Sequence, residues 1–305
     1  MNGLLRLLIC AAGLLVWFPG EGHAQQYAVN WVATTGSDSN DCYLTTPCRS
    51  FSHVLTKTAT NGVITCLDSG TFGPLVINRS LTVNCDGGKA DSGITVTSAA
   101  TDRVVLTGFV QAPEGPIVFN GAGSLILDRV TVNRSATGGL QFTPNGAGKL
   151  VVSNSRFLNG GNGTSGAGIL VKPAAGGSAQ ATLNGVTVSG NTFGIAVDGT
   201  GSTAGINVTI RDSVLGSNTN DGMIATSPGG GAPIGVLLAR SASTNNGYGV
   251  RSIGPGVTVR VDDSRIAGNG TALAASNGGA LLSVRNNLVQ ANGAHGAFTG
   301  SVALE

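Results

Sequence analysis

A nine-residue pattern recurs seven times between residues 127 and 292, and it constrains the fold more than any other feature of the sequence. Each copy begins with an aliphatic residue and carries a mostly apolar residue at its sixth position, and successive copies start 23 to 31 residues apart. The copies are Leu127–Ser135, Val152–Gly160, Leu183–Asn191, Ile210–Asn218, Leu238–Asn246, Val261–Asn269 and Val284–Asn292. Repeats of this length are typical of solenoids, in which each repeat buries its apolar side chains against its neighbours.

Short strand-like segments flank these copies on both sides. One precedes each copy, as at Asn207–Ile210, and another follows most copies, as at Gly194–Val197. Three short strands per repeat are typical of a parallel β-helix, in which strands of successive coils lie about 4.8 Å apart. We therefore predict an all-β fold, a parallel β-helix over residues 62–305. The 49 Gly residues fit this fold, because sharp turns between the strands need backbone with positive φ.

Asparagine occupies the ninth position in the last five copies of the pattern. Because Asn tolerates left-handed backbone, we expect this position to make the turn from one sheet to the next. Amides stacked at the coil repeat also hydrogen-bond along the axis, so we predict an internal asparagine ladder. Its members are Asn191, Asn218, Asn246, Asn269 and Asn292.

Residues 1–24 are predicted to be a secretory signal peptide. The apolar run Leu7–Phe18 ends at Pro19 and Gly20, and small residues precede a cleavage site near Ala24. The run is too short to span a membrane as a helix. We therefore expect a secreted protein, periplasmic or extracellular, whose mature chain has no membrane span.

Four cysteines follow the signal peptide. They are Cys42, Cys48, Cys66 and Cys85. An even number in an exported chain favours disulfides over metal ligands or catalytic thiols. Sequence alone leaves three pairings open. We favour Cys42–Cys48, which closes a tight loop, and Cys66–Cys85, because these two residues end strand-like runs that would stack in successive coils.

Residues 25–61 are expected to cap the first coil. The segment Ser50–Ala59 places Phe51 and Val54 on one helical face, which predicts a short amphipathic helix. Such a helix would cover the apolar floor of the first coil and its strand edge. The last coil, near Phe298–Leu304, has no evident cap. The chain is therefore expected to be a monomer or to associate end to end.

The step from asparagine to the following strand has the form x-N-x-x-G-[IV] and occurs at Asn191–Ile195 and Asn246–Val250. It resembles the repeat of the right-handed parallel β-helix superfamily that contains pectate lyases and polygalacturonases. The front segment Asn40–Phe51, continued by Gly62–Ile77, is similar to exported bacterial β-helix proteins without assigned activity. The resemblance covers nearly all of the mature chain. It implies the fold, and a fold by itself does not specify a reaction.

Charged residues recur at the second and third positions of the later copies. They are Arg211, Asp212, Arg240, Asp262, Asp263 and Arg285. Coil stacking would place them in two adjacent columns, with neighbours about 4.8 Å apart. By the resemblance, polysaccharide lyases of this fold hold calcium with carboxylates and use Arg or Lys as a base. The candidate catalytic residues are then Asp212, Arg240, Asp262 and Asp263, with calcium as the candidate cofactor.

The same charges have a second interpretation, an exposed ladder of salt bridges of alternating sign. Such pairs contribute little to stability. We favour this interpretation, because the Arg side chains flank the carboxylates and would compete with a cation. It requires no cofactor and no metal.

Two classes of function agree with these observations. A net charge of +2 without any Lys/Arg cluster argues against nucleic acid as a partner. We favour a non-catalytic extracellular structural or glycan-binding protein, whose partner would be an extracellular polysaccharide. The alternative is a carbohydrate-active enzyme, a polysaccharide lyase, hydrolase or epimerase acting on acidic polysaccharide. The two differ in whether Asp212, Asp262 and Asp263 converge with an Arg in an accessible groove or pair with Arg neighbours on a convex turn.

Overall fold

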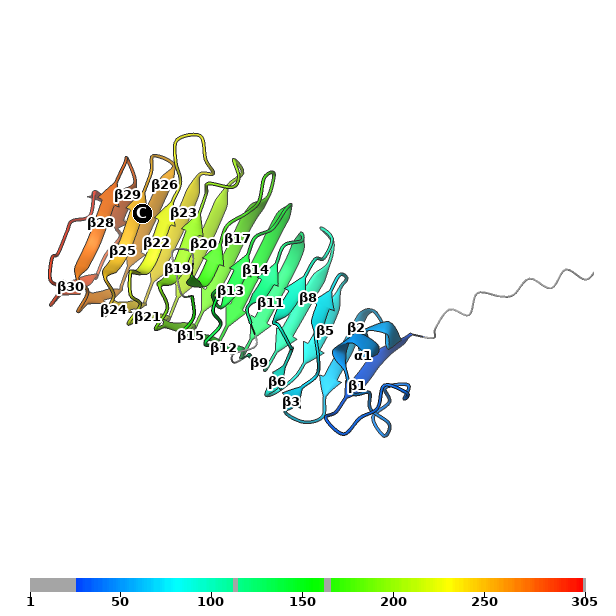
Figure 1. Cartoon of the computed structure of the whole chain (residues 1–305). Helices are drawn as coiled ribbons and strands as arrows, with labels where there is room; N and C mark the ends of the chain where they lie inside the picture. The colour runs from blue at the N-terminus through cyan, green and yellow to red at the C-terminus, as the bar shows by residue number, and fades with distance from the viewer. Residues whose placement is uncertain (1–25, 112–114, 162–165, 304–305) are drawn as a thin grey trace, which may run out of the picture.

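The computed structural model describes residues 26–111, 115–161 and 166–303. These residues form a stack of coils in which strands of successive coils pair in parallel (Figure 1). Three sheets run along the stack, with 12, nine and eight strands, and we call them the long, the middle and the short sheet. The predicted right-handed parallel β-helix with three strands per coil is confirmed. The predicted signal peptide, residues 1–24, lies outside the described residues.

Neighbouring strands within each sheet come from successive coils. In spatial order, the long sheet contains β1 (Tyr27–Val32), β2 (Thr58–Cys66), β5 (Leu81–Asn84), β8 (Arg103–Thr107), β11 (Gly123–Asp128), β14 (Ala147–Ser153), β17 (Ser178–Asn184), β20 (Ile206–Arg211), β23 (Ile234–Ala239), β26 (Val257–Asp262), β29 (Ala280–Ser283) and β31 (Gly300–Ser301). The middle sheet contains β28 (Thr271–Ser276), β25 (Tyr248–Ile253), β22 (Asp221–Thr226), β19 (Phe193–Asp198), β16 (Ala167–Val171), β13 (Leu140–Phe142), β10 (Ile117–Phe119), β7 (Ile94–Val96) and β4 (Leu75–Ile77). The short sheet contains β30 (Leu288–Gln290), β27 (Arg265–Ala267), β24 (Ala242–Thr244), β21 (Val214–Gly216), β18 (Thr187–Ser189), β15 (Arg156–Leu158), β12 (Thr131–Asn133) and β9 (Val110–Gln111). A separate pair consists of β3 (Gly70–Thr71) and β6 (Gly88–Lys89).

Side chains alternate across each strand of the long sheet, because successive residues of a strand point to opposite faces. In β17, for example, Ala181 and Leu183 are buried, whereas Thr182 and Asn184 face solvent. In the seventh copy of the pattern, Ser283 and not Val284 pairs in register with Val261. The aliphatic first positions of the other six copies point inward and stack in register, as predicted. They are Leu127, Val152, Leu183, Ile210, Leu238 and Val261.

Phenylalanine side chains fill the core in the first half of the stack. Phe119 and Phe142 are paired in register in β10 and β13, and their rings stack with centroids 4.8 Å apart. Phe51 and Phe72 approach with centroids 5.3 Å apart beneath the N-terminal cap. All four are fully buried. Parallel coils thus align like side chains above one another, which gives a continuous core along the stack.

The N-terminal end is covered by a short helix, α1 (Phe51–Lys57), as predicted. The Ser50 side chain accepts a hydrogen bond from the backbone N–H of His53 and caps the helix. Phe51 and Val54 face the core and are fully buried. The helix ends earlier than Ala59, because the chain from residue 58 onward pairs as β2 with β1, a strand that the sequence pattern did not indicate. None of the helices in the described residues is long and apolar enough to cross a membrane.

Both favoured disulfides are confirmed. Cys42 and Cys48 close a loop beside α1, with Cα atoms 4.6 Å apart. Cys66 ends β2 and Cys85 directly follows β5, the neighbouring strand, and their Cα atoms are 4.7 Å apart. The second bridge therefore joins two successive coils, where strand spacing brings Cα atoms into disulfide range.

The left-handed turns lie elsewhere than expected. The ninth position of the pattern does not have positive φ; the eighth position does, with φ from 53 to 72°, and so does the third, with φ from 42 to 63°. The eighth positions are Arg134, Asn159, Gly190, Ser217, Asn245, Gly268 and Ala291. The expectation that the ninth-position asparagines make the turn is therefore wrong, because their amides are used inside the stack instead.

The ninth-position asparagines donate hydrogen bonds to one another along the axis. The Nδ2 atom of Asn191 donates to Oδ1 of Asn218 at 3.2 Å, and that of Asn218 donates to Oδ1 of Asn246 at 2.9 Å. The same contact links Asn246 to Asn269 and Asn269 to Asn292, each at 3.0 Å. Each acceptor oxygen also receives the backbone N–H of the preceding asparagine. Four of the five side chains are buried, and Asn292 in the last coil is half-buried.

Glycine in the x-N-x-x-G step makes room for these amides. A Cβ atom on Gly194 would lie 2.9 Å from Nδ2 of Asn218, and one on Gly249 would lie 3.0 Å from Nδ2 of Asn269. Both distances are shorter than ordinary van der Waals contact, so a larger residue would displace the amide. A backbone carbonyl of the next coil approaches each of these positions even more closely, so the amide and the carbonyl together require glycine there.

Candidate functional site

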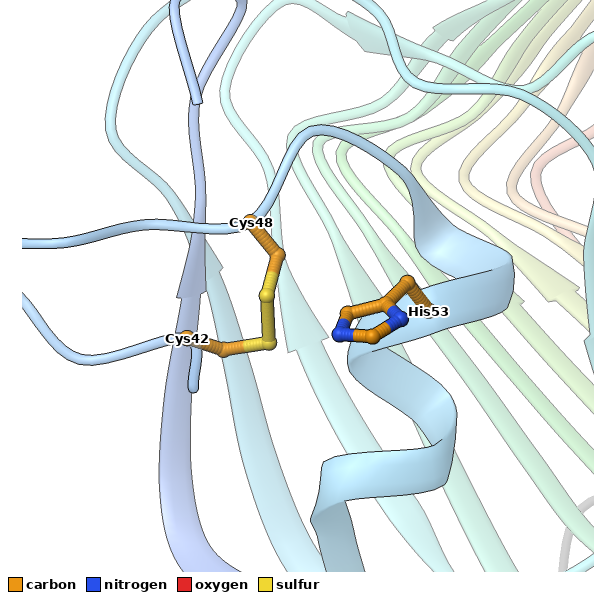
Figure 2. A group of neighbouring side chains, drawn as sticks. All are labelled: Cys42, Cys48 and His53. Carbon is orange, nitrogen blue, oxygen red and sulfur yellow. A yellow bond between two sulfur atoms is a disulfide. The ribbon is translucent and has the colours of Figure 1, made fainter. Parts of the chain in front are cut away.

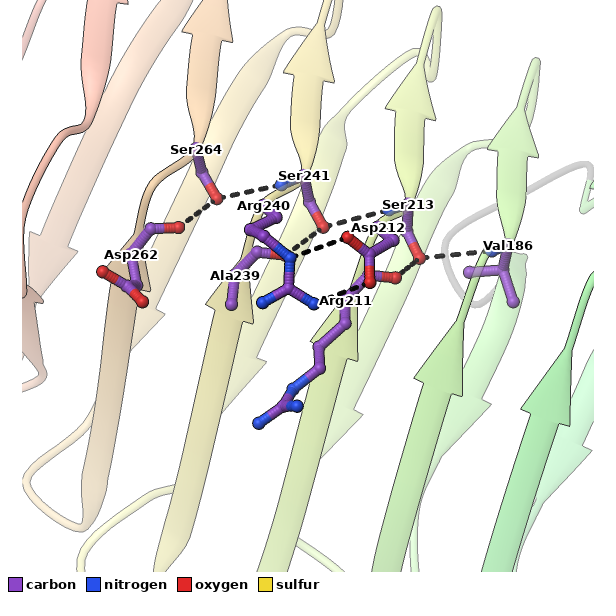
Figure 3. Close-up of polar contacts among 9 residues, drawn as sticks. All are labelled: Val186, Arg211, Asp212, Ser213, Ala239, Arg240, Ser241, Asp262 and Ser264. Carbon is purple, nitrogen blue, oxygen red and sulfur yellow. Dashed lines mark hydrogen bonds and ion pairs between the residues drawn. The ribbon is translucent and has the colours of Figure 1, made fainter.

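Coil stacking brings part of the predicted charge cluster together. Asp212, Arg240 and Asp263 follow β20, β23 and β26 and share the third position of the pattern, each with positive φ. Figure 3 shows Arg240 directed at Asp212 of the preceding coil. Its Nε and Nη2 atoms donate to the two carboxylate oxygens at 2.9 and 2.8 Å. Asp262 lies one position earlier, and its Oδ1 is 3.7 Å from Nε of Arg285.

The Asp212–Arg240 pair has bidentate geometry and is exposed to solvent, with side-chain exposures of 47% and 50%. Hydrogen bonding by Arg240 lowers the pKa of Asp212, and the same contact raises the pKa of Arg240. A carboxylate in this state is a weak base, because its lone pairs are already occupied by a guanidinium.

An open groove of about 580 Å³ lies over this corner of the stack. Asp212, Arg240 and Asp263 line it together with Arg265 and Leu288 of the short sheet. The structure therefore combines features of both interpretations, because three of the candidate residues reach a groove while Asp212 and Asp262 each pair with an Arg. Asp262 does not line this groove.

The residues of this corner do not fit a calcium ion. Calcium binds six to eight oxygen atoms, with several carboxylates on one ion. Here Arg240 occupies both oxygens of Asp212, and Arg285 adds a second positive charge beside Asp262. In the described parts of the chain, the one group of three metal-ligating side chains within 4.8 Å does not involve these carboxylates.

That group is Cys42, Cys48 and His53 (Figure 2). The two sulfur atoms are bonded to each other as a disulfide. Metals bind cysteine as the thiolate, which a disulfide cannot supply. The His53 Nε2 atom lies 3.2 Å from the backbone oxygen of Asn40, so the ring also has a neighbour in the loop. The cluster fits a structural role at the cap.

Sequence reasoning missed a column of buried serines beside the charges. The Ser213 hydroxyl accepts a hydrogen bond from the N–H of Val186 and donates to the carbonyl of Arg211 (Figure 3). Ser241 and Ser264 repeat this arrangement in the next two coils. The signal was present in the sequence, because the fourth position of the pattern is Ser in four copies. These hydroxyls satisfy backbone groups and are not exposed nucleophiles.

A polar surface on the outside of the long sheet was also missed. Lys149, Gln180 and Asn207 form one row across β14, β17 and β20, and Asn184 pairs in register with Arg211 further along the strands. We call this surface the polar face and define it by Lys149, Gln180, Thr182, Asn184, Asn207, Thr209 and Arg211. Two shallow depressions of about 370 and 480 Å³ cover it and share Thr182 and Thr209.

The polar face carries positive charge. Lys149 and Arg211 are exposed, and Arg103 of β8 and Arg260 of β26 extend the exposed cations along the same sheet. Among the described residues, no carboxylate lies within ion-pair distance of Lys149, Arg103 or Arg260. These cations of the long sheet are therefore available to a ligand, unlike the charges of the Asp212–Arg240 pair.

The most perturbed carboxyl group lies on the middle sheet. Asp221 begins β22 and is fully buried, with Oδ2 paired to Nη2 of Arg251 in the next coil. Burial raises the pKa of Asp221 to about 6, although Arg251 acts in the opposite direction. The sequence held no signal for this pair, because neither residue belongs to the nine-residue pattern and Arg251 is in register with Ile224 and not with Asp221.

Asp221 is expected to make stability depend on pH. A carboxyl whose pKa is raised to about 6 on folding stabilises the folded state fully below its unfolded pKa of about 3.9. That contribution is lost as the pH rises through 6. The free energy of unfolding of wild type, relative to Asp221→Asn, should therefore fall by about 2–3 kcal/mol from about pH 4 to about pH 7. Urea denaturation of both proteins across this range measures it, and a constant difference would contradict the raised pKa.

The fold is similar to that of a solved structure, pectate lyase Pel9A. The two chains are 17% identical with a TM-score of 0.64, and the alignment covers 92% of this chain and 79% of the other. A rhamnogalacturonan lyase aligns with 12% identity and a TM-score of 0.47, over 83% of this chain and 84% of that one. None of the family models and none of the curated proteins compared matches the chain. At this identity the likeness shows the fold alone, and it agrees with the parallel β-helix described above.

Proposed function

We propose that this protein is a secreted, non-catalytic β-helix that binds acidic polysaccharide on the polar face of the long sheet. The observation that carries the proposal is the contrast between two groups of charges. The cations of the polar face have no carboxylate partner among the described residues, whereas Asp212 and Asp262 of the candidate catalytic cluster are each paired with an Arg. The binding groups thus have no carboxylate partner, whereas two of the three candidate catalytic carboxylates are engaged by an Arg.

The geometry of the polar face suits an extended polymer. Strands of neighbouring coils lie about 4.8 Å apart, so a chain lying along the stack meets a new side chain at each coil. Lys149 supplies a cation for a sugar carboxylate, and Gln180 and Asn207, next in the same row, supply amides that bind hydroxyl groups. Arg211 adds a second cation at the other end of the strands, with a planar guanidinium that binds carboxylates through two hydrogen bonds.

Export is part of the proposal. The two disulfides fit an oxidising compartment, periplasmic or extracellular. The leader predicted at residues 1–24 would direct the chain there, and the mature chain would begin near Gln25.

Calorimetry on the mature protein with polygalacturonate and alginate, with and without calcium, tests the proposal. We expect binding without calcium, at least tenfold weaker in Lys149→Ala/Arg211→Ala and weaker as salt increases, because screening acts on exposed charges. The matched control Asp262→Asn/Asp263→Asn should bind at least as tightly as wild type, since it removes negative charge beside the polar face.

The same samples are assayed for release of oligosaccharides. Absence of heat with either polymer, or unchanged binding in Lys149→Ala/Arg211→Ala, would overturn binding at the polar face. Release of oligosaccharides that disappears in Asp262→Asn/Asp263→Asn would overturn the non-catalytic assignment in favour of a lyase or hydrolase. Intact polymer after prolonged incubation supports the proposal.

A further inference from the structure

The middle sheet carries a buried ion pair that the proposed function does not use. Asp221 is in register with Phe193 of β19 on one side and with Tyr248 of β25 on the other. Arg251 reaches back over it from the next coil, and its guanidinium carbon lies 4.5 Å from the centroid of the Tyr248 ring. Phe193 and Tyr248 are half-buried and the Arg251 side chain is 24% exposed. The pair therefore lies on the outer side of the sheet, just below its surface.

The contact between the two side chains is incomplete. Arg251 donates through Nη2 to Oδ2 of Asp221 alone. Oδ1 of Asp221 and Nε of Arg251 are both buried and have no hydrogen-bond partner among the described residues. The exposed Asp212–Arg240 pair makes the bidentate contact that this pair lacks. Buried polar groups are almost always satisfied by protein, ordered water or a ligand. The acceptor Oδ1 and the donor Nε therefore mark a place that suits a group able both to donate and to accept.

A groove of about 350 Å³ opens beside this pair, lined by apolar residues that include Phe193 and Ile224 and by the charged residues Lys172 and Asp198. Asp221 and Arg251 do not line it themselves. Phe193 is the register neighbour of Asp221, and Ile224 is that of Arg251. Apolar walls with a few polar groups at one end are typical of small-ligand sites.

The charges of the middle sheet are balanced. Its nine strands contain Asp198, Asp221 and Arg251 as their charged residues, and Lys172 directly follows β16. Lys172 pairs with Asp198 at 2.8 Å, and Arg251 pairs with Asp221. Each cation on this sheet thus has a carboxylate, in contrast to the polar face. A charged sugar would have to compete with an internal counter-ion on this sheet, whereas an uncharged sugar would not.

We propose that Asp221 and Arg251 form a second sugar site, which takes an uncharged sugar through two neighbouring hydroxyl groups. One hydroxyl donates to Oδ1 of Asp221, and the adjacent one accepts from the Arg251 guanidinium, which moves aside from the carboxylate as the ligand enters. The Phe193 ring packs against the apolar face of the sugar. The site stands on its own observations and does not depend on ligand binding at the polar face.

Calorimetry of the mature protein with cellohexaose, mannohexaose and xylohexaose tests this site. We expect at least one of them to bind with an affinity that does not change with salt. Binding should weaken at least tenfold in Asp221→Asn, which removes the charged acceptor at constant shape, and in Arg251→Lys, which keeps the charge and loses the planar fork. Lys149→Ala/Arg211→Ala on the long sheet is the matched control and should bind the same oligosaccharide as wild type does.

Circular dichroism verifies that each variant is folded. If Asp221→Asn does not fold, binding by Arg251→Lys still tests the site. Failure of all three oligosaccharides to bind would overturn the site, as would equal binding by wild type and the two variants. Loss of binding in the long-sheet variant would also overturn it, since the uncharged sugar would then bind at the polar face. Because polygalacturonate is measured separately, the two proposals stand or fall independently.

Discussion

Replacement of Asn218 by Ala is expected to lower the free energy of unfolding by about 3–5 kcal/mol, because several buried groups lose their partners at once. Oδ1 of Asn218 accepts from both the backbone N–H and Nδ2 of Asn191, and its Nδ2 donates to the carbonyl of Val188 and to Asn246. Asn218 is 2% exposed, so water cannot take over these contacts. Urea denaturation followed by circular dichroism measures the loss.

Asn292→Ala is the matched control. Asn292 makes similar contacts, accepting from Asn269 and donating to the carbonyl of Ile266, but it is half-buried in the last coil. Water can reach the groups that lose their hydrogen bonds to Asn292, so we expect the free energy of unfolding to fall by about 1 kcal/mol. Equal losses in the two variants would show that burial does not set the strength of these contacts.

Phe142→Ala is expected to destabilise the protein by about 3–5 kcal/mol, the usual cost of removing a large buried ring. The Phe142 ring is fully buried and stacks on Phe119 of the neighbouring coil. Its loss leaves a cavity that rigid parallel strands on all sides cannot close. Chemical denaturation monitors the change, with Phe142→Leu expected to retain part of the lost stability because it refills some of the space.

Phe298→Ala is the control for this substitution. Phe298 packs against the end of the same core and is partly buried, so about 1–2 kcal/mol is expected. A comparable loss at both positions, or a loss below about 1 kcal/mol at Phe142, would contradict a continuous core along the stack.

Much of the fold was predictable, because its determinants recur along the chain. The aliphatic first positions, from Leu127 to Val261, predicted stacked inward columns that the structure confirms. The pairing of Cys66 with Cys85 followed from the same spacing, since residues that end neighbouring strands lie at the coil distance. The cap helix was visible from Phe51 and Val54, which need only local helical periodicity. Each of these inferences used a pattern confined to one coil or repeated in every coil.

The candidate site was less predictable. The alignment of Asp212 with Arg240 followed from the repeat. The repeat did not predict that the cations of the polar face lack a carboxylate partner while Asp212 has one. Lys149 occupies no position that the repeated pattern singles out, and its place beside Gln180 follows from strand register alone. The left-handed turns were assigned to the wrong position, because Asn suits both a turn and a buried amide contact, and sequence does not distinguish the two.

The sequence by itself determined that this chain coils and how its apolar side chains stack, and it favoured one of the three possible pairings of its cysteines. The first two of these properties depend on a short pattern that repeats, so each copy of the pattern supports the interpretation of the other copies. The tertiary structure alone decided which polar groups face each other across coils. Coil length varies between 23 and 31 residues, and the variation falls in the turns next to the middle sheet. Asp221 and Arg251 are not register partners, because Asp221 pairs with Tyr248 and Arg251 pairs with Ile224. They meet because the Arg251 side chain reaches back along the sheet to the carboxylate, which only the three-dimensional structure shows.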